Sequence, residues 1–179
     1  PPYVQAVSEE NVSETDALDR GVTVRGIYAP EAFELPGAFE EAMQALGRGE
    51  QARVHPAVPM KLVVADDSTA MLPLSSQDAV DSAVVLHAPM VVAALGRLFE
   101  LLWRQASPLP RWSPDAPADD PVDTELIALL GTGLKDEAIA RELQISIRTL
   151  GRRMSGLLDS LGARTRFQAG VQAARRGLL

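Results

Sequence analysis

Alternating and periodic apolar positions divide the first hundred residues into short strands and helices. Residues 1–19 are polar and acidic, which is typical of a frayed helix or a tail. β-branched, partly alternating runs predict strands over residues 22–29, 51–58, 60–67 and 83–88. The turn residues Asp66-Asp67-Ser68 and the apolar run at 70–74 predict a hairpin over 60–74. Helical spacing predicts helices over 38–46 and 91–104. We therefore expect an α/β fold with a mixed sheet.

A proline-rich stretch separates this part from the rest of the chain. Residues 107–121 (SPLPRWSPDAPADDP) hold five prolines and no periodicity, which predicts an extended, semi-rigid tether. We accordingly expect an N-terminal domain over residues 1–106 and a second domain over residues 122–179.

The second domain has the pattern of a small all-α, four-helix unit. Its segments cover 122–130, 136–143, 147–161 and 167–176, with glycines after the first and third. Ser146 suits the N-cap of the third helix, after a connection of three residues. Leu150, Met154 and Leu157 share one face of that helix, and the pattern assigns four polar residues to the other: Arg148, Thr149, Arg152 and Arg153.

Charge and composition narrow the function classes. The net charge is −7, but residues 1–121 carry −10 and residues 122–179 carry +3, which fits a local nucleic-acid footprint on an acidic body. The chain has no cysteine and therefore no disulfide or thiolate metal site. The start at Pro1 predicts a trimmed or processed N-terminus. We see no signal peptide, and the apolar stretch at 83–95 is too short to span a bilayer, so we expect a cytoplasmic protein without membrane contact.

A short helix, a tight turn and a longer helix with arginines on one face would suit entry into a DNA major groove. An ordinary amphipathic helix with a solvated basic face fits the composition equally well. The run GLKDEAIARELQISIRTLGRRMSGLLDSLGARTRFQAGVQAARRGLL resembles the LuxR/FixJ helix-turn-helix family over about sixty residues. Twelve residues stand where that family's pattern expects them: Gly133, Leu134, Ile139, Ala140, Leu143, Ile145, Ser146, Arg148, Thr149, Leu161, Arg166 and Ala169.

The resemblance implies that the third helix reads DNA and that the fourth supports a homodimer. The DNA-binding residues we expect are Lys135, Ser146, Arg148, Thr149, Arg152, Arg153, Thr165 and Arg166. Three positions depart from the family pattern. Ala138 replaces a usual Glu, Arg153 stands where His is common, and Gly151 replaces a side chain on the recognition helix. Gly151 either permits a close approach of the helix backbone to DNA or is a tolerated substitution without a role in binding.

The N-terminal part lacks the paired acidic residues of a phosphoreceiver domain. Residues 59–66 (PMKLVVAD) resemble the phospholipase D signature H-x-K-x-x-x-x-D, with Pro59 in place of the nucleophilic His and with one copy of the motif visible. A strand that begins with a Lys and ends in a turn Asp explains the same residues. The stretches RGVTVRGIY, VHPAVPMKLVVADDSTAMLPL and LFELLW resemble the sensor of actinobacterial-type regulators with a degenerate phospholipase-D-like, TrmB-related domain before a LuxR-type helix-turn-helix.

These features predict a DNA-binding transcription regulator and not an enzyme. A ligand pocket would use Arg25, Arg53, His55, Lys61 and Asp66, where a lost phosphodiester site could leave an anion pocket. His55 and His87 lack spaced partners for a metal, so we expect no catalytic residues, metal or cofactor. The expected partners are double-stranded DNA, a second copy of the chain, and a small-molecule or protein effector. The alternatives are a phosphodiesterase-like protein, a dimerisation platform, and a pure protein-interaction module.

Overall fold

The computed structural model describes residues 12–74, 83–110 and 122–179, and its α/β part holds two small sheets. The first sheet has the order β1-β2-β6, formed by Arg25–Tyr28, Gln51–Val54 and Ser107–Pro108. β1 and β2 are parallel, whereas β6 pairs antiparallel with β2. The second sheet is the antiparallel meander β3-β4-β5, formed by Val63–Ala65, Thr69–Pro73 and Ala83–Leu86. The expected mixture of strand directions is therefore present, but it is divided between two sheets.

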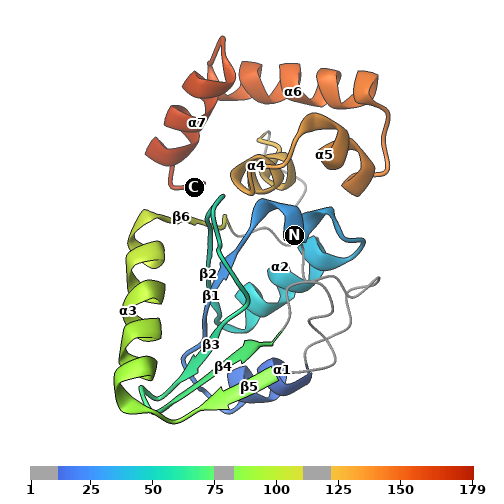
Figure 1. The fold of residues 1–179 in the computed structure, drawn as a ribbon. Coiled ribbons are helices and arrows are strands. Elements are labelled where there is room, and N and C mark those ends of the chain that lie inside the picture. The colour runs from blue at the N-terminus through green and yellow to red at the C-terminus, as the bar shows by residue number, and fades with distance from the viewer. Residues whose placement is uncertain (1–11, 75–82, 111–121) are drawn as a thin grey trace.

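Helices lie on both sides of the first sheet (Figure 1). The helix α1 covers Val12–Asp19, and the 3-10 helix η1 covers Pro30–Glu34. The helix α2, Ala38–Arg48, packs its apolar face on Ala52 and Val54 of β2. The helix α3, Pro89–Gln105, lies on the opposite side, where the Arg53 side chain reaches it. This alternation along β2 follows from the period of two in a strand.

The hairpin predicted over 60–74 is confirmed as β3 and β4, with Val64 opposite Ala70. The helix predicted over 91–104 is confirmed as α3, with Pro89 in its first turn. Two elements were not predicted, namely η1 and β6. β6 uses the first residues of the segment expected to be a tether, and Leu109 directly after it is buried. The remainder of that segment, residues 111–121, lies outside the described residues.

Four helices follow residue 122. They are α4 (Thr124–Gly131), α5 (Asp136–Glu142), α6 (Ile147–Leu161) and α7 (Arg166–Arg175). One cluster of buried apolar side chains extends from η1, α2 and β2 through Leu109 and Val122 into these helices. In Figure 1, α4 and α5 face the α/β part, and α6 lies on the far side of them. The packing therefore leaves the outer face of α6 uncovered by the α/β part.

Candidate nucleic-acid interface

The helix α6 has one buried and one exposed face. Leu150, Met154, Leu157 and Leu161 are all less than 7% exposed. The exposed face carries Arg148 and Arg152, one helical turn apart. Among the described residues, neither arginine takes part in an ion pair. The two guanidinium groups are therefore available to a ligand outside the protein.

A short turn joins α5 to α6. Gln144 adopts a left-handed conformation (φ 52°), and the Ile145 N–H donates to the Ala140 carbonyl at 2.9 Å. Ser146 caps α6, because its hydroxyl accepts a hydrogen bond from the Thr149 N–H at 3.1 Å. The predicted cap is confirmed. The Ser146 hydroxyl is therefore engaged in capping α6, and the Thr149 Oγ1 lies 2.9 Å from the Ser146 Oγ.

Arg153 does not lie on the exposed face with Arg152, so its predicted placement opposite the core is wrong. Its Nε donates to Asp123 Oδ2 at 2.7 Å. Its Nη2 donates to Asp123 Oδ1 at 2.7 Å and to Glu125 Oε2 at 2.8 Å. The reason is the helical step of about 100° per residue. It turns Arg153 about 140° away from Arg148 and onto the flank of the buried stripe, beside Leu157.

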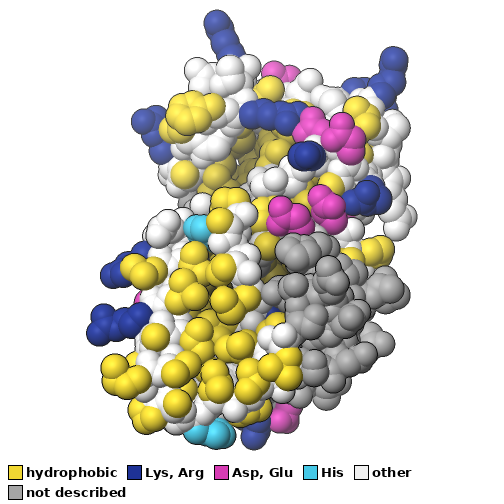
Figure 2. All heavy atoms as spheres, in the orientation of Figure 1, with side chains coloured by type: hydrophobic (Ala, Val, Ile, Leu, Met, Phe, Trp, Pro, Cys, Tyr) yellow, Lys and Arg dark blue, Asp and Glu magenta, His cyan; other side chains and the backbone are white. Residues whose placement is uncertain are grey.

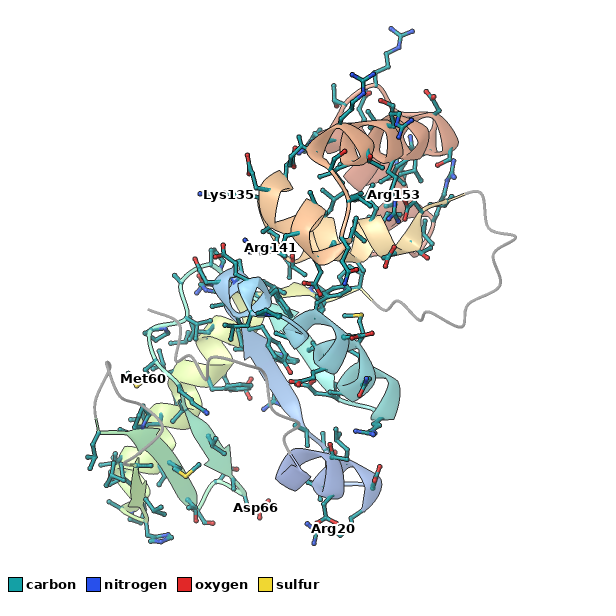
Figure 3. The ribbon with its side chains drawn as sticks, turned by 90° about the vertical axis from the view of Figure 1, so that its right-hand side faces the viewer. Arg20, Met60, Asp66, Lys135, Arg141 and Arg153 are labelled. Atoms are coloured by element: carbon teal, nitrogen blue, oxygen red, sulfur yellow. The ribbon has the colours of Figure 1, made fainter. Side chains whose placement is uncertain are left out.

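Two more of the expected DNA-binding residues have structural partners. Thr165 caps α7 by accepting a hydrogen bond from the Gln168 N–H at 3.2 Å. Arg166 donates two hydrogen bonds, of 2.8 and 2.7 Å, to Asp136 at the start of α5. Hydrogen bonding to Asp136 raises the pKa of Arg166, and the same bonds hold the pKa of Asp136 below its ordinary value. Both residues of this pair remain partly accessible to solvent, whereas Lys135 is exposed and points away from the helices (Figure 3).

Sequence reasoning missed the role of Arg176. Its guanidinium donates to the carbonyl oxygens of Ser160 and Leu161, at 3.1 and 3.4 Å. Carbonyls in the last turn of a helix have no intrahelical donor, so a C-terminal cation suits them. The position of Arg176, fifteen residues beyond Leu161, gives no local signal of this contact.

The helix α7 presents an apolar surface. Phe167 is 82% exposed and Val171, one turn later, is 37% exposed. On the other side of the same helix Ala169 and Ala173 are buried against the α4–α7 core. An exposed phenylalanine beside an exposed valine is a feature that protein contacts use.

The five residues of the expected ligand pocket do not converge. Arg25 and Arg53 do lie together, with their guanidinium carbons 5.2 and 4.5 Å from the centre of the Trp103 ring. Each also has a polar partner, Glu100 Oε1 at 2.6 Å for Arg25 and the Trp103 carbonyl oxygen at 2.7 Å for Arg53. His55 is buried after β2, and its Nδ1 accepts a hydrogen bond from the Ala57 N–H at 3.0 Å.

Lys61 and Asp66 belong to the other sheet. Lys61 is exposed before β3, and Asp66 is exposed in the β3–β4 turn with φ 51°. Figure 3 shows Asp66 at the end of the molecule far from α4–α7. His87, at the end of β5, lies 3.3 Å from the Thr69 hydroxyl. Residues 59–66, where the sequence predicted a remnant of the phospholipase D signature, thus lie in and before a hairpin whose turn is exposed to solvent.

The outer face of that hairpin sheet is apolar. Val63, Met71 and Val85 are opposite one another across the three strands and are 45%, 40% and 52% exposed. Met90 at the start of α3 is 83% exposed. Figure 2 shows hydrophobic side chains gathered over this part of the molecule, and Lys and Arg side chains projecting from the α6–α7 end. The β3–β5 end and the α6–α7 end of the molecule therefore differ in surface chemistry.

Comparison with known proteins finds similarity to a regulatory protein. The chain is similar to the Bialaphos biosynthetic pathway regulatory protein of Streptomyces hygroscopicus, with 35% identity over 167 residues. The matched region covers 91% of this chain and 64% of the relative. No family model matches the chain, and no solved structure is significantly similar to it. In the described residues, none of the helices has the length and apolar character needed to cross a bilayer.

Proposed function

We propose that this chain is a transcription regulator that binds double-stranded DNA in a sequence-specific manner through α6. The observation that carries the proposal is the exposed pair Arg148 and Arg152, opposite a buried apolar stripe and directly after a short turn. A helix of this width fits the major groove, and arginine can donate two hydrogen bonds to a guanine edge. The similarity to a pathway regulatory protein supports the regulatory part of the proposal.

Two kinds of contact follow for the remaining residues. Lys135, at the N-cap of α5, would neutralise a phosphate, and Arg148 and Arg152 are the candidates for base contacts. Ser146, Thr149 and Thr165 retain oxygen atoms that can accept or donate at the DNA backbone while they cap their helices. Arg166 would reach DNA only at its remaining N–H groups.

The experiment is a selection of duplexes from a random library, followed by fluorescence anisotropy at several salt concentrations. We expect a salt-sensitive, sequence-selective isotherm that Arg152→Ala weakens by about 1–3 kcal/mol, with relaxed specificity at one position of the operator. Arg175→Ala is the matched control, because Arg175 is an exposed arginine in the last turn of α7 and its loss changes the net charge equally. If the library yields no enriched sequence, or if both variants behave alike, the DNA-binding proposal fails.

The proposed active form is a homodimer that contacts a two-fold symmetric operator. Phe167 and Val171 on α7 would form a self-complementary contact around the two-fold axis. Sedimentation velocity on the full chain should give a dimer that Phe167→Ala converts to monomer without loss of helix content. A dimer that survives this substitution would place the contact elsewhere, with the apolar face of β3–β5 as the next surface to test.

The α/β part is proposed to receive a signal from a small molecule or a protein partner. Arg25 and Arg53 against Trp103 carry two positive charges, and Glu100 forms an ion pair with Arg25. An anionic effector would compete with Glu100 for Arg25. Inorganic phosphate, sugar phosphates and nucleotides should then raise the melting temperature of the protein in a concentration-dependent way. No shift with any of them would leave a protein partner as the effector.

A further inference from the structure

Arg153 is bound to two carboxylates, and this leaves few of its N–H groups free to contact DNA. Three of its five N–H groups donate to Asp123 and Glu125, at 2.7, 2.7 and 2.8 Å. The arginine side chain is 29% exposed, and those of Asp123 and Glu125 are 22% and 29% exposed. Hydrogen bonding to Asp123 is the main reason why the pKa of Arg153 is raised. A charged donor held by two partly buried acceptors forms a strong and directional contact.

The local charge also disfavours a phosphate at this site. Two carboxylates face one guanidinium, so a DNA phosphate that approached Arg153 would meet a net negative charge. If Arg153 turned toward the DNA, it would leave two partly buried acids close together without their cation. This differs from Arg148 and Arg152, which lie in solvent without an ion-pair partner among the described residues.

The same contact fixes α6 relative to α4. Asp123 is the N-cap of α4, and its Oδ1 accepts from the Leu126 N–H at 3.0 Å as well as from Arg153. The middle of α6 is therefore tied to the first turn of α4. Figure 3 shows Arg153 lying between these two helices. At its C-terminal end α6 is held by Arg176, so two polar contacts restrain its rotation about its own axis.

We infer that Arg153 is a positioning residue that holds α6 at the rotation in which Arg148 and Arg152 face the groove. The inference rests on the proposed function, because the rotation of α6 matters only if that helix reads DNA. A cation that touched a phosphate would add to affinity for every sequence alike. A cation that orients base-reading side chains affects specificity, measured as the affinity for the selected operator relative to a random duplex.

Arg153→Lys separates the two roles. Lysine keeps the charge for a phosphate but cannot make the forked contact to Asp123 together with the contact to Glu125. We expect this variant to lower the specificity ratio by about tenfold, the size of one lost bidentate base contact. The salt slope should be unchanged, whereas Lys135→Ala, at the proposed phosphate contact, should lower it by about one. A Lys variant with the wild-type specificity ratio would overturn the inference.

The complementary variant removes the partner and leaves Arg153 in place. Asp123→Asn preserves an N-cap for α4, because asparagine caps as well as aspartate. It should lower the specificity ratio as Arg153→Lys does, and the double variant should be no worse than either single variant. Additive losses, or tighter specific binding once Arg153 is released, would mean that Arg153 contacts DNA. Circular dichroism of each variant separates a rotated α6 from an unfolded protein. If the wild type selects no operator, the proposed function fails and this role fails with it, whereas a selective wild type with an indifferent Arg153 overturns this inference alone.

Discussion

Gly131 is the position where one methyl group tests how α4 packs on the α/β part. An ideal Cβ at this last residue of α4 would lie 2.7 Å from Cγ and 2.8 Å from Cδ of Pro110. Both atoms belong to a rigid ring next to the buried Leu109, so the ring cannot rotate away. Gly131→Ala should therefore push α4 and Pro110 apart.

Two opposing effects set the magnitude. Overpacking typically costs about 1–3 kcal/mol. Replacing glycine by alanine in a helix returns up to about 1 kcal/mol, and less at a helix end. We expect a net loss of about 1–2 kcal/mol in the free energy of unfolding, or about 2–8 °C in melting temperature for a chain of this size.

Gly151→Ala is the matched control. Gly151 lies inside α6 and is exposed, and a Cβ there would have no atom within 4 Å. The same substitution should raise the free energy of unfolding by about 0.5–1 kcal/mol. Urea unfolding followed by circular dichroism measures both variants. Equal stabilisation of both would refute the contact between Pro110 and α4. The DNA affinity of Gly151→Ala also separates the two explanations of this glycine. A loss of affinity would indicate close approach of the backbone to DNA, and an unchanged affinity would indicate a tolerated substitution.

Substitutions at three further positions test the packing of α4–α7. Leu157→Ala, at a side chain 2% exposed, should lower the free energy of unfolding by about 2–5 kcal/mol in the same urea titration, and a loss below about 1 kcal/mol would mean that α6 is turned differently. Thr132→Val should lower it by about 1–3 kcal/mol, because the buried hydroxyl donates to the Leu129 carbonyl at 2.6 Å and accepts from the Leu134 N–H at 3.3 Å, whereas Thr132→Ser should keep most of the stability. Burial, with Glu40 nearby, raises the pKa of Glu142 above its ordinary 4.5, so its contribution to stability falls as pH rises through the folded-state value. Glu142→Gln should therefore raise the melting temperature near neutral pH and leave it nearly unchanged below pH 4.5, and an equal effect at both pH values would contradict this reasoning.

Local signals in the sequence were sufficient where one element decides its own structure. The hairpin at 60–74 follows from two apolar runs around Asp66-Asp67-Ser68, and both aspartates adopt positive φ angles that this residue type tolerates. The cap at Ser146 and the buried stripe of α6 follow from helical spacing alone. These features depend on neighbours within one or two turns of chain.

Contacts between distant residues could not be predicted in the same way. β6 consists of Ser107 and Pro108, which are poor strand residues, and it forms because the edge of β2 can accept a proline there. The partners of Arg153 lie thirty and twenty-eight residues before it. A helical projection of α6 would have shown that Arg153 borders the apolar stripe, but the acids at the start of α4 become its partners only through tertiary packing.

The buried cluster that runs from Phe33 through Leu109 to Leu126 has a consequence for communication within the chain. Side chains that share one core unfold together, so an opening of α6 that disrupts this core must also loosen η1 and β2. A molecule that binds only the α/β part would then slow hydrogen exchange of the amides in α6, by the same free energy with which it stabilises its own site. The core itself can thus carry a signal to the helix that we propose reads DNA, without any change in the average positions of the atoms.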